Sequence, residues 1–171
     1  GAEADVAQIL PRSKSLKKGN VDWPYKYNWS LFPQRANDFT EFLALLESGY
    51  FTGLYDNTKA NLKIRQPVTG TQLGYGFNRV QAAMDYCDIH GYWCHPAFPG
   101  GKWDTTHWNL RNGSVVNSYG HPGNTFTKLA QARILGKPFT VSEYDHPNLN
   151  FYCAEGNVML AAMGAFQNWS A

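Results

Sequence analysis

The sequence has little charge, few cysteines and no long apolar run. Charged residues make up 16% of the 171 residues and the formal net charge is +2, so no charge excess favours a nucleic-acid or membrane partner. No apolar stretch approaches the ~20 residues that a membrane-spanning helix needs. The three cysteines, Cys87, Cys94 and Cys153, include no CxxC pair. We therefore expect free thiols, with one disulfide at most. From the low net charge and the lack of a long apolar run we expect neither a nucleic-acid nor a membrane partner.

Several common catalytic motifs are also missing. The glycine-rich stretch 70–76 lacks both the lysine of a phosphate-binding loop and the GxGxxG spacing of a dinucleotide site. There is no GxSxG nucleophile elbow. The five histidines occur in no HExxH or comparable spacing. The sequence therefore predicts neither a cofactor nor a metal site.

The chain does contain a large apolar and aromatic fraction. Hydrophobic residues make up 43% of it and aromatic residues 15%, which is typical of a chain with a packed core and not of a disordered one. The length is enough for one domain with a core and short for two. We therefore treat residues 1–171 as a single catalytic or binding region.

Helical and strand patterns alternate along most of the chain. Apolar residues at three-to-four-residue spacing predict a helix over 38–62, beginning at a capping box of Asp38 and Glu41. Residues 1–37 show no period, so we expect an irregular segment there with one short helix at Ala4–Leu10. The remaining pattern predicts strands over 66–72, 85–93 and 137–144, helices over 77–86, 124–136 and 154–168, and the start of a fourth strand over 169–171. This alternation indicates an α/β fold of parallel βα units over 38–171.

Polar residues gather at the ends of two predicted strands. Functional groups of parallel βα folds lie at the carboxyl ends of the strands, and these ends carry His90, Tyr92 and Glu143. His90 and Tyr92 are two residues apart, so they lie on one face of their strand. A carboxylate in such a place must be paired, hydrogen-bonded or protonated. Glu143 is therefore either a functional group or part of a structural ion pair, and His90 is either a site residue or a hydrogen-bonded core histidine.

A long loop over 94–123 is a second candidate region. Loops longer than ~15 residues in compact domains are usually functional or disordered, and this loop is rich in aromatic side chains, including Trp103 and Trp108. Aromatic planes beside polar hydrogen-bonding groups suit sugar rings. The alternative is that the loop is a packed cover over one end of the sheet.

A family resemblance is carried by two blocks, DYCDIHGYWCHPAFPGGKWDTTHW (85–108) and GKPFTVSEYDHPNLNFYCAEGNVMLAAMGAFQNW (136–169). They resemble the C-terminal half of a cellulase-like glycoside hydrolase of the retaining TIM-barrel type, and the likeness extends over roughly 38–171. The resemblance implies hydrolysis of O-glycosyl bonds in β-linked oligosaccharides or polysaccharides, without a cofactor. It also favours a secreted or periplasmic location.

The resemblance gives individual residues a role. In the family the sixth strand ends in a His-x-Tyr element, here His90 and Tyr92, and the seventh ends in the nucleophile, here Glu143. In a retaining mechanism the nucleophile attacks the anomeric carbon while a second carboxyl, about 5–5.5 Å away, protonates the leaving oxygen. The resemblance further implies substrate contacts from Trp93, Trp103, Trp108, Tyr144 and His146.

One feature of the family is missing from the sequence. The family's proton donor is a glutamate that follows an asparagine, and no Asn-Glu dipeptide occurs here; Asp88, Asp104 and Asp145 are the substitutes within the chain. Because a full barrel has ~250 residues, we expect a partial (β/α)8 TIM barrel, a half-barrel corresponding to strands 5–8. Its open edges predict a homo-oligomer or a missing N-terminal half. The alternative function is a non-catalytic carbohydrate-binding or oligomerising module with a vestigial site.

Overall fold

The chain forms two compact units, residues 1–50 and 51–171, whose boundary falls within one long helix. Leu16–Lys18 form a turn of 3-10 helix, η1. The short helix expected at Ala4–Leu10 lies outside the described residues, as does most of the irregular segment expected over 1–37. The computed structural model describes residues 14–22, 30, 33–73, 76–118, 120, 121 and 123–170.

The long helix α2 spans Pro33–Asp56, and a π-helical turn, η3 (Asn57–Asn61), continues it. The predicted helix is confirmed in kind, but it begins at Pro33 and not at Asp38. Proline suits the first turn because its missing N–H would be unsatisfied there and its φ is preset. Asp38 lies within the helix, where it accepts a hydrogen bond from Gln34 Nε2 at 2.9 Å. None of the described helices is both long and apolar enough to cross a membrane.

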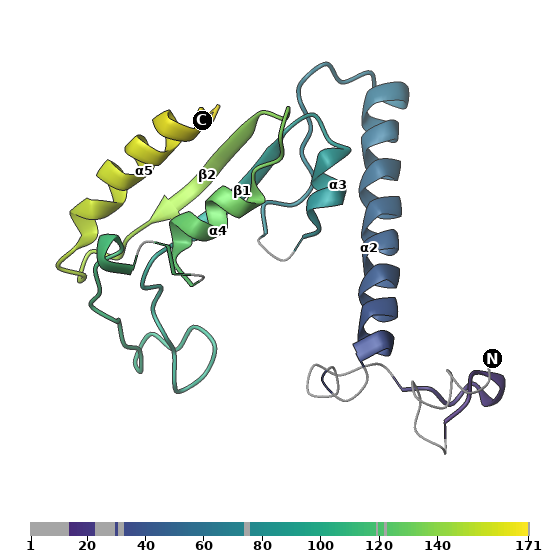
Figure 1. The fold of residues 1–171 in the computed structure, drawn as a ribbon, viewed down its shortest axis with the longest axis horizontal. Helices are drawn as coiled ribbons and strands as arrows, with labels where there is room; N and C mark the ends of the chain where they lie inside the picture. Colours follow the sequence, from purple (N-terminus) through teal and green to yellow (C-terminus); the bar gives the residue numbers. More distant parts are fainter. Residues whose placement is uncertain are drawn as a thin grey trace. The chain divides into compact units, whose positions relative to one another are not determined.

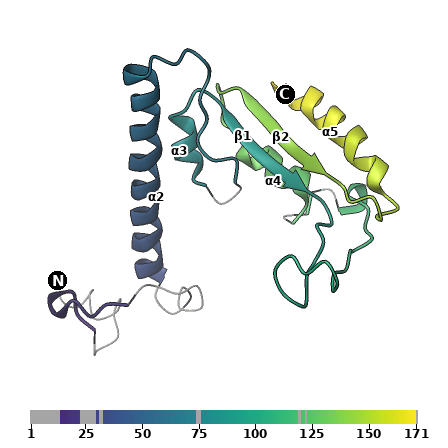
Figure 2. The same ribbon diagram turned by 180° about the vertical axis from the view of Figure 1, so that it is seen from behind.

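Two parallel strands form the sheet of the second unit. Strand β1 (Cys87–Tyr92) pairs with β2 (Phe139–Asp145), and the connection between them contains helix α4 (Thr125–Ala132). Helix α5 (Cys153–Gln167) follows β2 and runs beside it (Figures 1 and 2). The unit is therefore a mixed α/β structure with the parallel βα connectivity that the alternating pattern predicted. Asn124 caps α4, since its side chain accepts a hydrogen bond from the Phe126 N–H at 2.9 Å.

One face of this sheet packs against α4 and α5. Burying an apolar side chain there stabilises the fold by about 1.5–3 kcal/mol. Glycine at position 91 leaves room for its neighbours, because a Cβ there would lie 3.1 Å from both Thr125 Oγ1 of α4 and Tyr144 Cδ2 of β2. The buried cluster consists of Cys87, Ile89 and Trp93 in and after β1, Val115 in the connection, Phe126 and Leu129 of α4, Phe139 of β2 and Met163 of α5.

The predicted strand over 66–72 does not form a regular strand. The segment nevertheless runs along β1: Val68 O accepts a hydrogen bond from Asp85 N–H at 3.0 Å, and Gln72 O accepts one from His90 N–H at 3.1 Å. The residue numbers increase together on the two sides, from 68 to 72 and from 85 to 90, so the segment runs parallel to β1. Other backbone groups of the segment bond side chains instead of β1: Val68 N–H donates to Asp85 Oδ2 at 2.9 Å, and Thr71 O accepts from Gln81 Nε2 at 2.7 Å.

Other element ends also differ from expectation. Helix α3 (Asn78–Ala82) is shorter than the predicted 77–86, and the loop before α4 contains a 3-10 turn, η4 (Val116–Ser118). The fourth strand expected over 169–171 is not formed within the described residues. Ser170 N–H does donate to Phe139 O at 2.8 Å, on the edge of β2 that faces away from β1. A further segment therefore begins to pair where the next strand of a larger sheet would lie.

Candidate functional site

A β-bulge in β2 decides which side chains share a face of the sheet. Asp88 pairs with Thr140, but His90 pairs with Glu143, so β2 contains one extra residue between the two pairs. In an uninterrupted register Ser142 would stand opposite His90, and Glu143 would point toward the helices. The bulge therefore turns Glu143 to the face that lies away from α4 and α5.

Glu143, His90 and Tyr92 meet on that face. His90 Nδ1 lies 2.6 Å from Glu143 Oε2, and the two side chains are 20% and 55% exposed. The ring of Tyr92 stands edge-on to the His90 ring, with 6.4 Å between centroids. Hydrogen bonding to Glu143 is the main cause that raises the pKa of Tyr92 to about 12, followed by burial and by the charges of Glu143 and Asp145. The structure thus brings together the three residues that the sequence singled out for catalysis.

This arrangement can hold a reactive carboxylate in place. A carboxylate oxygen only accepts hydrogen bonds, so the proton in the contact of 2.6 Å is carried by His90 Nδ1. Tyr92 supplies a second donor to the same carboxylate. Hydrogen bonds to an ionised acceptor are short and directional, so the two donors fix the orientation of Glu143. Its exposed half remains accessible to a ligand, and such a group can act as a nucleophile or a general base.

Of the residues expected to contact substrate, Trp93 and His146 are buried and Tyr144 is partly buried. Tyr144 is on the helix side of β2 because neighbours in a strand point to opposite faces; its ring lies 5.4 Å from Phe126. Its hydroxyl contacts Nε2 of His146 at 2.5 Å, and His146 is 7% exposed, with its pKa lowered mainly by burial. Trp93 is 6% exposed and donates from Nε1 to Gly113 O at 2.8 Å. The structure therefore does not bring Tyr144, His146 or Trp93 to the face of Glu143.

A row of rings runs from Tyr92 to Trp103. Tyr92 and His95 have centroids 5.7 Å apart, and those of His95 and Trp103 are 5.8 Å apart. Trp103 is 62% exposed and also contacts Phe98, at 5.2 Å between centroids. The other predicted tryptophan, Trp108, is 44% exposed. Exposed indole faces of this kind offer a flat apolar surface to a ligand. His95 and Phe98 were not singled out from the sequence, since a loop has no period that shows which side chains meet.

Two aspartates considered as proton donors differ in their surroundings. Asp104 accepts hydrogen bonds from the hydroxyl and N–H of Thr106, at 2.6 and 2.9 Å, and from His107 N–H at 3.2 Å. These contacts, the Thr106 hydroxyl first, lower the pKa of Asp104, whereas an efficient acid at neutral pH needs a raised pKa. Asp145 is exposed and follows Glu143 by two residues on the same face of the sheet.

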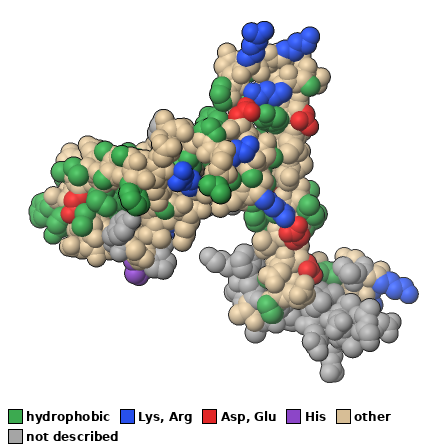
Figure 3. Space-filling view, turned by 45° about the horizontal axis from the view of Figure 1, so that its top comes forward, with side chains coloured by type: hydrophobic (Ala, Val, Ile, Leu, Met, Phe, Trp, Pro, Cys, Tyr) green, Lys and Arg blue, Asp and Glu red, His purple; other side chains and the backbone are tan. Residues whose placement is uncertain are grey.

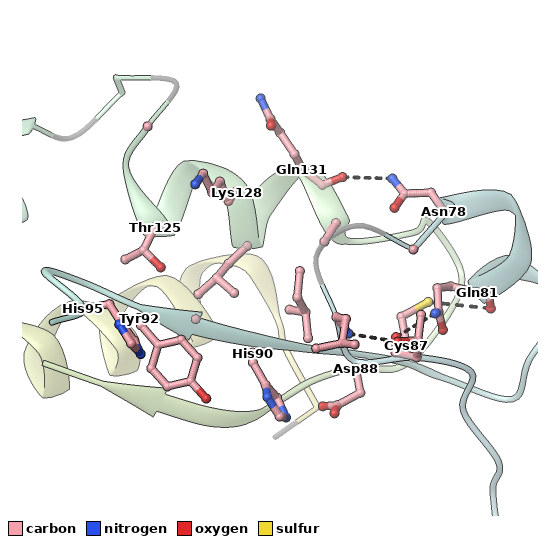
Figure 4. A pocket seen from close by; sticks show the side chains of 18 residues that line it. Asn78, Gln81, Cys87, Asp88, His90, Tyr92, His95, Thr125, Lys128 and Gln131 are labelled. Carbon is pink, nitrogen blue, oxygen red and sulfur yellow. Dashed lines mark hydrogen bonds between the residues drawn. The ribbon is translucent and has the colours of Figure 1, made fainter. Parts of the chain in front are cut away.

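A cavity of about 750 Å³ opens beside β1 (Figure 4). His90 and Tyr92 line it from one side of the strand, and Thr125 and Lys128 of α4 line it from the other. Figure 4 shows the two groups on opposite sides of β1, with His90 and Tyr92 pointing away from α4. Glu143 stands on the β2 side of His90 and is not part of the cavity wall. The cavity therefore adjoins the carboxylate without being centred on it.

Within the described parts of the chain, no group of three or more histidine, cysteine, aspartate or glutamate side chains is placed to hold a metal ion. Comparison with protein-family models, with curated proteins and with solved structures finds no match for the chain. The function is therefore argued from the site itself.

Proposed function

We propose that the chain is a retaining glycoside hydrolase acting on β-linked glycans, or the C-terminal half of one, with Glu143 as nucleophile. The contact of 2.6 Å between His90 Nδ1 and Glu143 Oε2 carries the proposal, because it holds an accessible carboxylate near a strand end. Glu143 attacks the anomeric carbon, the bond from that carbon to the leaving oxygen breaks, and a glycosyl-enzyme forms that water then hydrolyses. His90 and Tyr92 orient the carboxylate during the attack.

The order of the sheet supports an origin in a barrel. Residues 66–72, β1 and β2 lie side by side in chain order and run in the same direction, and Ser170 begins to pair at the far edge of β2. Helices α4 and α5 pack on one face. In a (β/α)8 barrel each strand is added beside the preceding one, whereas the order reverses in a doubly wound sheet. We propose that this unit corresponds to strands 5–8 of such a barrel.

A retaining enzyme also needs a proton donor about 5–5.5 Å from its nucleophile. Asp104 is a poor candidate because its hydrogen bonds stabilise the charged carboxylate. We propose that the donor is supplied by a second copy of the chain or by an N-terminal half that completes the barrel. Asp145, on the same face as Glu143, is the alternative within the chain.

A reagent that needs no proton donor tests Glu143 directly. In a dinitrophenyl 2-fluoro-β-cellobioside the leaving group departs as a phenolate anion, and the fluorine slows hydrolysis of the covalent intermediate. We expect the chain to release one phenolate per molecule and to gain the mass of one fluorosugar on the peptide that contains Glu143. The Glu143→Gln variant should release none, because an amide is a poor nucleophile.

The matched control is Asp85→Asn, which removes a carboxylate at the opposite end of the sheet and should leave labelling unchanged. Labelling of Glu143→Gln at the same rate would show that Glu143 is not the nucleophile. The same test can be made with the corresponding dinitrophenyl 2-fluoro-β-xyloside and 2-fluoro-β-mannoside. Failure of the unmodified chain to react with any of the three reagents would contradict the glycosidase proposal.

The exposed indole of Trp103 and the row of rings beside it favour a second candidate, a non-catalytic carbohydrate-binding module. Such a module would bind oligosaccharides through stacking without any covalent step. Calorimetry that detects cello-oligosaccharide binding, together with the absence of labelling and no effect of Glu143→Gln on affinity, would favour this function over hydrolysis.

A further inference from the structure

We infer that Asp88 is a positioning residue that holds the bulge of β2 in the register that presents Glu143 to His90. The importance of Asp88 for catalysis rests on the proposed function. Its effect on the pairing register of β1 and β2 does not depend on that proposal. Asp88 lies two residues before His90 on the same face of β1. The sequence placed it among the polar residues of the predicted strand over 85–93 and suggested it as a substitute proton donor.

The contacts of Asp88 span the bulge. Its Oδ1 accepts hydrogen bonds from the Thr140 hydroxyl, just before the extra residue, and from the Ser142 N–H at 3.1 Å, within the bulge. Its Oδ2 accepts a hydrogen bond from the Ser142 hydroxyl. A bulge leaves a backbone group without its ladder partner, and an unpaired N–H is costly. The carboxylate of Asp88 supplies the acceptor that the ladder no longer provides to Ser142.

The register that Asp88 selects has a direct effect on Glu143. If β2 continued without the bulge, Glu143 would stand opposite Gly91, where Tyr144 now lies. That position is packed tightly, since a Cβ added at Gly91 would lie 3.1 Å from Thr125 Oγ1 and from Tyr144 Cδ2. A carboxylate there would be withdrawn from solvent and from His90. Holding the bulge therefore keeps the carboxylate on the open face and beside its hydrogen-bond donor.

All three contacts of Asp88 are made to β2, so it acts through Glu143 and not on the substrate. The conservative change Asp88→Asn keeps one acceptor oxygen for Ser142, whereas Asp88→Ala removes both. We expect a graded effect, with Asp88→Asn milder than Asp88→Ala. If the variants only destabilised the whole fold, the effect on the position of Glu143 would not be larger in Asp88→Ala than in Asp88→Asn, and the rest of the fold would change as well.

The tautomer of His90 provides a readout that needs no substrate. Because Glu143 accepts from Nδ1, the neutral imidazole carries its proton there, and Nε2 lacks one. Nitrogen-15 shifts of the ring, read through its carbon-bound protons, distinguish the two tautomers. We expect Asp88→Ala to shift His90 toward the Nε2–H form, as Glu143→Ala should by removing the acceptor, while the control Asp85→Asn keeps the Nδ1–H form.

The labelling reaction provides the catalytic readout. We expect the maximal rate of labelling by the fluorinated cellobioside to fall about tenfold to a hundredfold in Asp88→Ala, as a displacement of about 1 Å can cause. The reagent concentration at half-maximal rate should stay unchanged, because both carboxylate oxygens of Asp88 are already bonded to Thr140 and Ser142. Asp85→Asn should label at the normal rate per folded molecule.

The outcomes separate this inference from the proposed function. An unchanged His90 tautomer and labelling rate in Asp88→Ala, or equal losses in Asp85→Asn, would overturn the role of Asp88. If the unmodified chain is not labelled but the tautomer still changes in Asp88→Ala, Asp88 does position Glu143 and the glycosidase proposal fails. If Asp88→Ala does not fold, the double variant Thr140→Val, Ser142→Ala removes the two hydroxyl contacts but keeps the Ser142 N–H contact. It must then give a smaller shift in the same direction for the inference to stand.

Discussion

Asp85 joins three segments of the second unit through one carboxylate. Lys59 Nζ lies 2.7 Å from Oδ2, the Tyr55 hydroxyl donates to Oδ1 at 2.7 Å, and Val68 N–H donates to Oδ2 at 2.9 Å. These contacts, led by Lys59, lower the pKa of Asp85 from 3.8 to about 2. The carboxylate therefore fastens the end of η3 and the segment beside β1 to the start of the sheet.

The depressed pKa predicts how stability depends on pH. The unfolded chain binds the proton of Asp85 more tightly than the folded chain does, so the stabilisation is fully present above about pH 4 and is lost as pH falls toward 2. We expect Asp85→Asn to unfold at a lower temperature than the unmodified chain at neutral pH. The difference between the two melting temperatures should shrink below pH 4. A difference that stays constant down to pH 2 would contradict the assignment.

At the level of residues, the sequence predicted the members of the site only near the ends of the predicted strands. Spacing by two put His90 and Tyr92 on one face, and the structure has them there. The bulge was not predictable, since it depends on contacts between Asp88 and a strand that lies far along the chain. The same alternation that exposes Glu143 places Tyr144 on the helix side of the sheet. Predicting that every aromatic residue near Glu143 contacts the substrate therefore includes residues that face away from it.

At the level of elements, the first turn of α5 anchors the long loop before α4. Both carboxylate oxygens of Glu155 contact the Ser114 hydroxyl at 2.9 Å, and Oε2 accepts hydrogen bonds from Val115 N–H at 2.9 Å and Val116 N–H at 3.3 Å. An acidic side chain also suits the N-terminal turn of a helix. Glu155 therefore stabilises α5 and the fold of the loop together.

Removing Glu155 should destabilise the fold without touching the face of Glu143. Val115 is fully buried, so Glu155→Ala leaves its N–H without an acceptor, which costs about 1–3 kcal/mol in the free energy of unfolding. Glu155→Gln keeps an acceptor oxygen and should cost less. Urea denaturation followed by circular dichroism measures both. Equal stability of Glu155→Ala and the unmodified chain would show that the loop is held by other contacts.

Helices and strands with a strong period could be predicted from the sequence, whereas their ends and pairing could not. The pattern located β1, β2 and α4, because each buries one face in the same core, and it located α5 as an alanine-rich apolar helix without a marked period. It failed over 66–72, where backbone groups of Val68 and Thr71 bond the side chains of Asp85 and Gln81 instead of a ladder partner. It also failed at Pro33, where a proline that suits a first turn outweighed a capping box further along.

At the scale of the whole molecule, α5 presents an apolar surface to solvent. Its exposed residues include Val158 and Phe166, which are 70% and 86% exposed, and Phe151 just before the helix is 88% exposed. The other exposed positions along the helix are mostly alanine. Figure 3 shows hydrophobic side chains gathered over the part of the second unit where α5 lies. Contiguous apolar surface of this kind is typical of an interface between proteins.

We therefore expect the chain to self-associate through α5 at micromolar concentration. Lysine at Val158 and Phe166 together would place charge in that interface and should shift the chain to a monomer, as measured by size-exclusion chromatography with light scattering. The matched control is Leu135→Lys, since Leu135 is 96% exposed but lies between α4 and β2; it should leave the association unchanged. Circular dichroism checks that each variant keeps its helices. A monomeric unmodified chain at tens of micromolar, or an equal response to the control, would place any partner surface elsewhere than on α5.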